Sequence, residues 1–153
     1  VQLMGGDAVR AALAFDKAFA PDVQRVAYVD PRQDTVEQVV AVAKAAGEHL
    51  NSVRISRTPG AKPVSASDVL IVRDRLDEIG ARSIQIVLSG RMNPERVRQL
   101  LADGAPVDMF HDTGYIASAA PIAFFPNIRS ISDREVPQET EPLPPNRRLL
   151  RLL

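Results

Sequence analysis

Two kinds of hydrophobic spacing alternate along the chain. In four short segments apolar residues occur at every second position, as at Ile84, Ile86 and Leu88, and a period of two is typical of a β-strand. The segments between them place apolar residues three or four positions apart, which is typical of a helix with one buried face. The spacing therefore predicts strands at residues 25–30, 52–56, 83–88 and 107–110.

Capping residues bound the segments between the predicted strands. Asn93 is placed to cap a helix, with Pro94 at its first position and Gly104 at its end. The second helix carries its apolar residues on one side, so these are predicted to face the core: Val36, Val39, Val40, Ala43 and Leu50. The four predicted helices begin near these residues: Asp7, Asp34 or Thr35, Ser67 and Asn93.

Short strands that alternate with helices predict an α/β fold with a parallel sheet. The regularity fits a flavodoxin-like sheet or half of an eight-stranded barrel, since a complete barrel takes about 250 residues. We predict a partial α/β barrel domain over residues 1–121 and a C-terminal extension with a Pro-rich tail over residues 122–153. In the extension, one or two strands are predicted from the apolar residues Phe124, Phe125, Ile128 and Ile131.

Charge and composition narrow the classes of function. Lys plus Arg and Asp plus Glu both number 19, so no net charge favours nucleic acid or an anionic membrane as partner. The chain has no cysteine, which excludes disulfides and thiolate metal sites and favours a cytoplasmic location. No apolar run reaches the length of a membrane span. Because the first residue is Val1, we expect a piece of a longer gene product.

Small and polar residues follow two neighbouring predicted strands. Ser89 and Gly90 follow the third strand, and a polar loop at residues 111–114 follows the fourth. In parallel α/β proteins, the loops beyond the carboxyl ends of the strands form the ligand site. The sequence therefore predicts a site at residues 89–91 and 111–114.

Five segments carry a further signal: GGDAVRAALAFD, VAYVDPRQDT, SVRISRTPG, IQIVLSGRMNPERVRQLLADGAPVDMF and TGYIASAAP. In this order, over most of residues 3–121, they resemble the carboxyl-terminal half of nicotinate phosphoribosyltransferases. The resemblance implies part of a TIM-like (type II phosphoribosyltransferase) barrel. It implies the coupling of nicotinate to phosphoribosyl pyrophosphate, which gives nicotinate mononucleotide in NAD biosynthesis. It also implies Mg²⁺ and ATP as cofactors, and a homo-oligomer or a missing amino-terminal half.

The resemblance implies roles for individual residues. Asp30 falls on an acid of the family near the reacting groups, so it is the catalytic candidate, and Arg54 falls on an arginine that meets the ribose phosphate. Backbone amides of a Gly-rich turn and an arginine fork both suit phosphate oxygens. Further phosphate-binding candidates are Ser89, Gly90, Thr113 and Gly114, with Arg91 and His111 as additions.

The chain departs from the family pattern in two places. Ser56 stands where the family has an Asp. The family's phosphate loop reads Phe-Gly-x-Gly-Gly, whereas Phe110 is followed here by His, Asp, Thr and Gly. Asp112 in this loop is expected to repel a phosphate unless it turns away. His111 has three alternative roles, which are phosphate binding, proton transfer near neutral pH, or filling the loop.

Two classes of function follow from these residues. The first is a nicotinate phosphoribosyltransferase-like enzyme domain that binds phosphoribosyl pyrophosphate and nicotinate. The second is a non-catalytic, degenerate barrel half that serves as a structural or interaction module. For the isolated chain we predict no transferase activity, because the family's catalytic histidine lies in the amino-terminal half.

Overall fold

The computed structural model describes residues 1–153 except 59, 113, 119–129, 133 and 136–153. The chain divides into two compact units, Val1–Ala119 and Ala120–Leu153. In the second unit the described residues form an antiparallel pair, β5 (Ser130–Ile131) and β6 (Arg134–Glu135). Of the residues predicted to form strands there, Ile131 lies in β5. The other three, Phe124, Phe125 and Ile128, lie outside the described residues. Most of the Pro-rich tail lies outside them as well.

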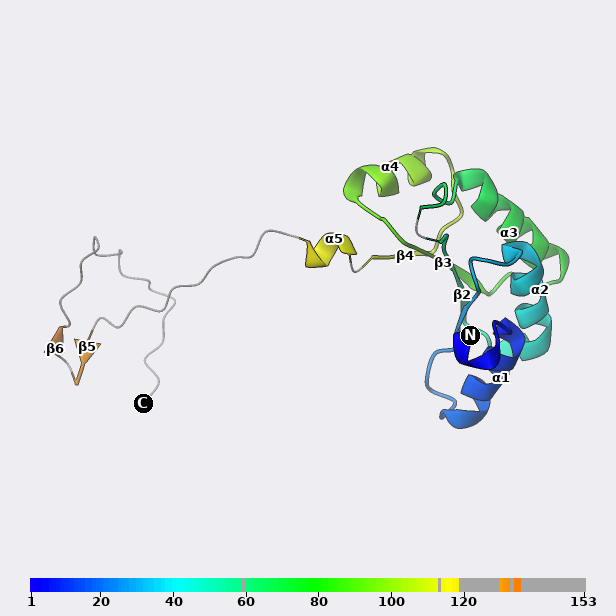
Figure 1. The fold of residues 1–153 in the computed structure, drawn as a ribbon, viewed down its shortest axis with the longest axis horizontal. Helices are drawn as coiled ribbons and strands as arrows, with labels where there is room; N and C mark the ends of the chain where they lie inside the picture. The colour runs from blue at the N-terminus through cyan, green and yellow to red at the C-terminus, as the bar shows by residue number, and fades with distance from the viewer. Residues whose placement is uncertain (59, 113, 119–129, 133, 136–153) are drawn as a thin grey trace. The chain divides into compact units, whose positions relative to one another are not determined.

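The first unit contains one parallel sheet whose strands follow chain order (Figure 1). Its four strands are β1 (Val26–Tyr28), β2 (Ser52–Ile55), β3 (Gln85–Ser89) and β4 (Met109–His111). In the ladder, Val53 lies between Ala27 and Ile86, and Leu88 lies opposite Phe110. The predicted parallel α/β class is confirmed. Among the described residues β1 and β4 each pair on one side only, so the sheet is open at both edges.

Helices connect the strands, and three of the predicted caps are confirmed. The side chains of Asp7, Asp34 and Asn93 each accept a backbone N–H from the first turn of the helix that follows. The third helix begins one residue earlier than predicted, because Ser65 and Asp68 form a reciprocal capping box. The helices are α1 (Ala8–Ala18), α2 (Thr35–Ala46), α3 (Ala66–Glu78), α4 (Pro94–Ala102) and α5 (Gly114–Ala117), with single turns η1 (Gln2–Met4) and η2 (Gly47–His49).

The core lies between one face of the sheet and helices α1 to α4. Alternate strand residues point into it, and Val53, Ile86 and Leu88 have no exposed surface. Figure 1 shows α2 and α3 together on one side of the strands. The prediction that α2 buries Val40 is wrong, since Val42 is fully buried in its place. Because a helix turns 100° per residue, the buried residues Val39, Val42 and Ala43 lie on one face of α2, and Val40 lies to its side.

The opposite face of the sheet carries partly exposed side chains. Val26, Tyr28 and Met109 are 47%, 38% and 50% exposed, although all three stand on strands. Apolar side chains of this size are normally buried when a sheet has layers on both sides. Their partial exposure agrees with the predicted part of a barrel.

Strand β4 begins at Met109, two residues later than predicted. Asp108 occupies the preceding position, where its N–H donates to the carbonyl of Ile86 at 3.1 Å and its carboxylate accepts the N–H of Ile86 at 2.7 Å. At the other end the strand extends to His111, which pairs with Ser89. His111 therefore belongs to the strand and not, as predicted, to the loop.

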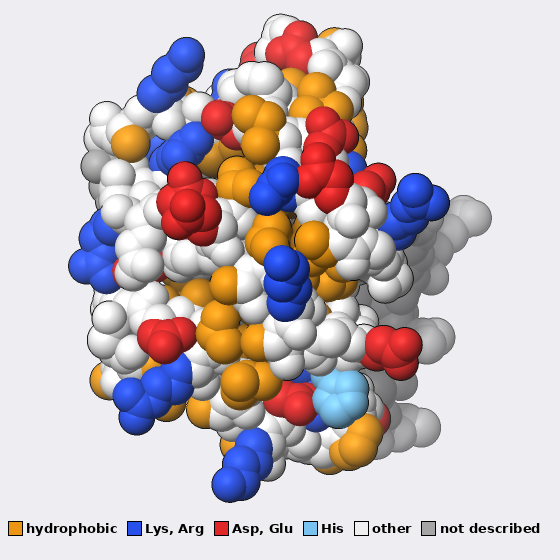
Figure 2. All heavy atoms as spheres, turned by 90° about the vertical axis from the view of Figure 1, so that its right-hand side faces the viewer, with side chains coloured by type: hydrophobic (Ala, Val, Ile, Leu, Met, Phe, Trp, Pro, Cys, Tyr) orange, Lys and Arg blue, Asp and Glu red, His pale blue; other side chains and the backbone are white. Residues whose placement is uncertain are grey.

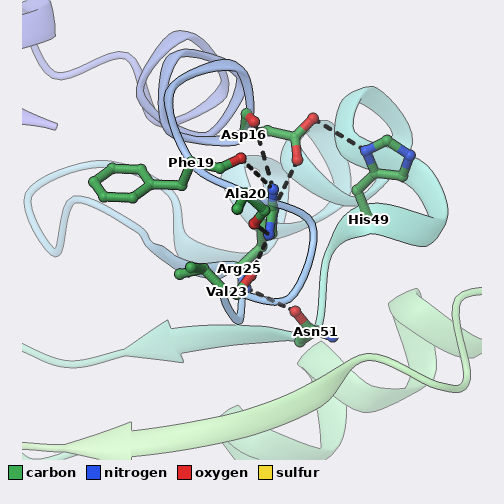
Figure 3. Close-up of polar contacts among 7 residues, drawn as sticks. All are labelled: Asp16, Phe19, Ala20, Val23, Arg25, His49 and Asn51. Carbon is green, nitrogen blue, oxygen red and sulfur yellow. Dashed lines mark hydrogen bonds and ion pairs between the residues drawn. The ribbon is translucent and has the colours of Figure 1, made fainter.

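A buried arginine holds the amino-terminal end of the sheet (Figure 3). Arg25 is 8% exposed, and its guanidinium donates to Asp16 Oδ1 at 2.8 Å. It also donates to backbone carbonyls of the segment between α1 and β1, at Phe19, Ala20 and Val23. His49 Nδ1 lies 3.0 Å from the second oxygen of Asp16. Arg25 thereby joins the end of α1 to the start of β1.

The side of the first unit that carries the helices has no patch of a single charge. Figure 2 shows basic and acidic side chains interspersed on this side, with apolar side chains between them. None of the helices among the described residues is long and apolar enough to cross a membrane.

Candidate functional site

An open hollow lies at the carboxyl ends of β2, β3 and β4, with a volume of about 590 Å³. We call it the arginine hollow, because Arg54, Arg57 and Arg91 all line it. It brings together most of the residues predicted for the site: Arg54, Ser89, Gly90, Arg91, His111 and Gly114. Thr113 lies outside the described residues. Asp30 is not part of its lining.

Arg54 lies on the open face of β2, where neighbouring side chains orient it. Its Nε donates to Ser89 Oγ at 3.1 Å, and its guanidinium carbon lies 5.3 Å from the centre of the Tyr28 ring. The Ser89 hydroxyl donates in turn to the carbonyl of Ile55, at 3.5 Å. An arginine held by Nε over an aromatic face keeps its terminal nitrogens available for an anion.

The turn after β3 has an unusual backbone. Gly90 has φ 97° and Arg91 has φ 49°, and both values lie in the region that favours glycine. A residue with a Cβ pays about 1–2 kcal/mol for a left-handed conformation. Backbone strain of this kind is concentrated at functional sites. Here the strained residue Arg91 lies in the lining of the arginine hollow.

Asp112 lines the arginine hollow, and its carboxylate is engaged by backbone N–H groups. Its Oδ1 accepts the N–H of Tyr115 at 2.8 Å, and its Oδ2 accepts the N–H of Met92. These hydrogen bonds hold the pKa of Asp112 below its usual value. The carboxylate thus ties the turn after β3 to the start of α5. It also uses two backbone N–H groups that could otherwise bind an anion.

Asp30 lies at the carboxyl end of β1 and is 3% exposed. Arg32 grips it with two nitrogens, Nε at 2.9 Å from Oδ1 and Nη2 at 2.6 Å from Oδ2. The hydrogen bonds from Arg32 lower the pKa of Asp30 to about 2. A carboxylate in this state is a weak base, so a catalytic role for Asp30 requires its release from Arg32.

The Asp30–Arg32 pair predicts a stability change in acid. The pKa of Asp30 is about 2 in the folded chain and 3.8 in the unfolded chain, so the pair stabilises the fold fully above pH 3.8. That stabilisation is lost as the pH falls from 3.8 to about 2. We therefore expect the thermal midpoint of Asp30→Asn, measured by circular dichroism, to fall less than that of the unchanged chain over this interval.

A matched control is Asp74→Asn, which removes an exposed carboxylate from α3. It is expected to follow the unchanged chain. If Asp30→Asn and the unchanged chain lose the same number of degrees between pH 4 and pH 2, the pair does not contribute as described.

Six residues of the arginine hollow were not among the predicted site residues: Tyr28, Ser56, Arg57, Met92, Asn93 and Tyr115. The Tyr28 hydroxyl lies 3.0 Å from Ser56 Oγ. A period of two places Tyr28 on the face opposite Ala27, so alternation along β1 could have found it. Arg57 forms an ion pair with Asp68 of α3, at 3.2 Å. Nothing in the local sequence indicates that pair.

The described residues do not form a Mg²⁺ site of their own. Protein ligands for Mg²⁺ are carboxylate oxygens with room for water and phosphate. Of the two acids at these strand ends, Asp30 is bound by Arg32 and Asp112 by backbone N–H groups. Among the described residues no three acids or histidines gather around one point. The Mg²⁺ implied by the resemblance therefore finds no such cluster of ligands among the described residues.

Comparison with family models gave no match, and comparison with curated proteins gave none either. Comparison with solved structures identifies a type II phosphoribosyltransferase-like fold. One of the structures that match is the crystal structure of nicotinate-nucleotide pyrophosphorylase from Pyrococcus furiosus, with a TM-score of 0.70 and 28% sequence identity. The match covers 88% of this chain and 34% of that one, so this chain spans about a third of the length of its neighbour.

Proposed function

We propose that this chain supplies phosphoribosyl-binding residues of a phosphoribosyltransferase in NAD biosynthesis. The observation that carries the proposal is the arginine hollow, which three arginines line at the carboxyl ends of neighbouring parallel strands. The matching structure is a nicotinate-nucleotide pyrophosphorylase. The favoured reaction joins nicotinate to phosphoribosyl pyrophosphate, giving nicotinate mononucleotide and pyrophosphate.

The geometry of the arginine hollow suits a phosphate. The terminal nitrogens of Arg54 offer a fork for two phosphate oxygens, and Arg91 adds positive charge from the rim. Gly90 has no side chain to obstruct the approach of an anion to its backbone. His111, half-buried beside Ser89, completes the wall. In this proposal Asp30, which lies outside the lining of the arginine hollow, has a catalytic role only when Arg32 releases it.

The proposal is tested by titrating the isotope-labelled chain with ribose 5-phosphate and following backbone amide signals by NMR. We expect shifts at residues 54, 89–92 and 111–115, with a dissociation constant in the high micromolar to millimolar range, or roughly −4 to −6 kcal/mol. Ribose without phosphate is the matched ligand and is expected to cause no shifts. Shifts confined to other residues would place phosphate binding elsewhere and end the proposal.

A second function has one specific observation in its favour. Asp112 already accepts the backbone N–H groups of Met92 and Tyr115, which leaves fewer N–H donors for a phosphate. A degenerate barrel half would bind no phosphate and would serve as a structural or interaction module. It would use its open edges, β1 and β4, to join another copy or an amino-terminal half. The same titration separates the two functions, because a module predicts no shifts.

The isolated chain is predicted to lack phosphoribosyl transfer activity. It spans about a third of the neighbouring enzyme's length, and its catalytic candidate Asp30 is bound by Arg32. Purified chain is incubated with nicotinate, phosphoribosyl pyrophosphate, ATP and Mg²⁺, and nicotinate mononucleotide is measured by chromatography. The control is heat-denatured chain. Product above this control would contradict the prediction and would show that 153 residues complete the site.

A further inference from the structure

The first unit is built from four helix–strand pairs in chain order. Each strand follows a helix, from α1 and β1 to α4 and β4, and neighbouring strands pair in parallel. Figure 1 shows the four helices in an arc around one side of the strands. An eight-stranded α/β barrel has this arrangement throughout, with its helices in an outer ring. The first unit therefore supplies half of the pairs that a closed barrel requires.

The free edge of β1 can accept another strand. The carbonyl of Arg25 and the N–H of Val29 bond to β2. Because backbone groups alternate in direction along a parallel ladder, those of Val26 and Tyr28 face away from β2. The strand contains neither Pro nor Lys, which commonly block pairing at an exposed edge. Backbone donors and acceptors are thus presented along β1 without local protection.

An apolar hollow with a volume of about 200 Å³ lies between α1 and β1, and we call it the α1–β1 hollow. Its charged lining residues, Asp16 and Arg25, bind each other, and the rest of the lining is apolar apart from the Tyr28 hydroxyl. Phe15 lines it, is 38% exposed and stacks on Phe19, which is 50% exposed. The small side chains that α1 contributes leave room for a large apolar group: Ala8, Ala11 and Ala12.

The edge of β4 carries a side chain that suits the α1–β1 hollow. Phe110 lies opposite the buried Leu88 in the ladder, so it is on the side of the sheet that the helices cover. It is only partly buried there, because β4 pairs on one side only among the described residues. The phenylalanine at this edge of one copy can therefore fill the hollow at the β1 edge of another copy.

We propose that two copies of this chain close one eight-stranded parallel barrel, in which β1 of each copy pairs with β4 of the other. The partner's Phe110 enters the α1–β1 hollow, and α1 covers the new junction as α2 to α4 cover the existing ones. The open face of the sheet, with Val26, Val87 and Met109, becomes the interior of the barrel, which side chains fill. All strand edges are then paired.

The register of this junction follows from the ladder. One row across the sheet runs from Tyr28 of β1 to Met109 of β4, where β4 begins, whereas β1 begins two residues earlier at Val26. The strands are thus staggered in one direction. A barrel with a shear of about 8 that closes from two equal halves shifts the row by about four residues at each junction. Met109 then lies beside the partner's Gln24, and His111 lies beside the partner's Val26.

This inference goes beyond phosphate binding and does not depend on it. In the closed barrel the carboxyl ends of all eight strands form one mouth. The arginine hollows of the two copies lie on opposite sides of this mouth, where Arg54 remains open to solvent. Because the partner's β1 borders His111, each copy completes the wall of the other copy's hollow.

The first measurement is the mass of the full chain in solution, by size-exclusion chromatography with light scattering at micromolar concentration. We expect a dimer with twice the 16.7 kDa of one chain. A monomer would leave both edges to another occupant, such as a segment of a longer gene product, and would overturn the inference.

Two variants locate the interface. Val26→Pro removes an N–H that faces the free edge, which an edge strand tolerates, and Ala11→Trp fills the α1–β1 hollow. Both are expected to shift the mass to that of a monomer while the circular dichroism stays unchanged. Val26→Thr keeps the N–H, and Ala14→Trp adds the same bulk to an exposed residue of α1 outside the hollow, so both controls stay dimeric. A dimer that survives Val26→Pro and Ala11→Trp uses another surface and overturns the inference.

A cross-link shows which strands meet, whether or not these variants fold. The chain has no cysteine of its own, so Val26→Cys and His111→Cys chains can be mixed and mildly oxidised. We expect a disulfide-linked mixed dimer, since neighbouring strands bring these two positions within bridging distance. Either chain alone is expected to form none, because the two copies of each strand lie on opposite sides of the barrel. If the mixture forms no more disulfide than either chain alone, the junction of β1 with β4 is overturned. Failure of the ribose 5-phosphate titration leaves this result untouched, so the two proposals fail separately.

Discussion

Replacement of Arg25 by Met lowers the free energy of unfolding by about 3 kcal/mol, because it removes a buried charge with several partners. The lost donors serve Asp16 Oδ1 and the carbonyls of Phe19, Ala20 and Val23 (Figure 3). Met has a similar length and no donor, so the apolar contacts of the stem are largely kept. In the variant, these carbonyl oxygens lie beside the apolar Met side chain and lose the guanidinium as their hydrogen-bond donor.

The measurement is urea unfolding followed by circular dichroism. The matched control is Arg10→Met, which replaces an exposed arginine of α1 and is expected to change stability by less than about 0.5 kcal/mol. A second readout is the thermal midpoint, which is expected to fall by about 10 °C for Arg25→Met. If both variants unfold at the same urea concentration, the buried network does not hold α1 to the sheet.

Replacement of Arg54 by Ala weakens the binding of ribose 5-phosphate by about 10- to 100-fold, or roughly 1.5–3 kcal/mol, the usual range for hydrogen bonds to charged groups. The loss is large because Arg54 is oriented before the ligand arrives. Ser89 holds its Nε, and the Tyr28 ring lies beneath its guanidinium. Arg54→Lys keeps the charge and loses the fork, so an intermediate affinity is expected.

Calorimetric titration of both variants measures the effect, and Arg98→Ala is the matched control. Arg98 lies on α4 with its side chain 71% exposed, outside the arginine hollow. Its removal is expected to leave the affinity within about twofold, since exposed charges contribute little. Equal affinities for Arg54→Ala and Arg98→Ala would show that the phosphate does not lie at the end of β2.

Several elements could be predicted from the sequence because their causes are local. Asn93 followed by Pro94 specifies the start of α4 through one side-chain acceptor and one fixed φ, and both lie within a few residues. Likewise the period of two at Ile86 and Leu88 is set by strand geometry alone. The predictions that Val40 is buried and that His111 lies in the loop were wrong, because packing within the core and pairing with Ser89 of β3 decided these positions.

The partners of the charged side chains at the site could not be predicted from sequence spacing, because the fold determines which groups come into contact. Arg32 is two residues from Asp30, yet only the folded turn shows that its guanidinium binds both oxygens of that carboxylate. The ion pair between Arg57 and Asp68 joins a strand end to a helix start. Asp112 was expected to oppose a phosphate, and the fold gives it backbone donors instead.

By itself the sequence determined the parallel α/β class, the order of its elements and the strand ends at which a site can form. These follow from hydrophobic period, capping residues and the chirality of crossovers, which act over short distances. Only the tertiary structure decided which residues share the site. Arg54, Ser89 and His111 come from three strands, and ladder register alone brings their side chains to one hollow while it leaves Asp30 with Arg32.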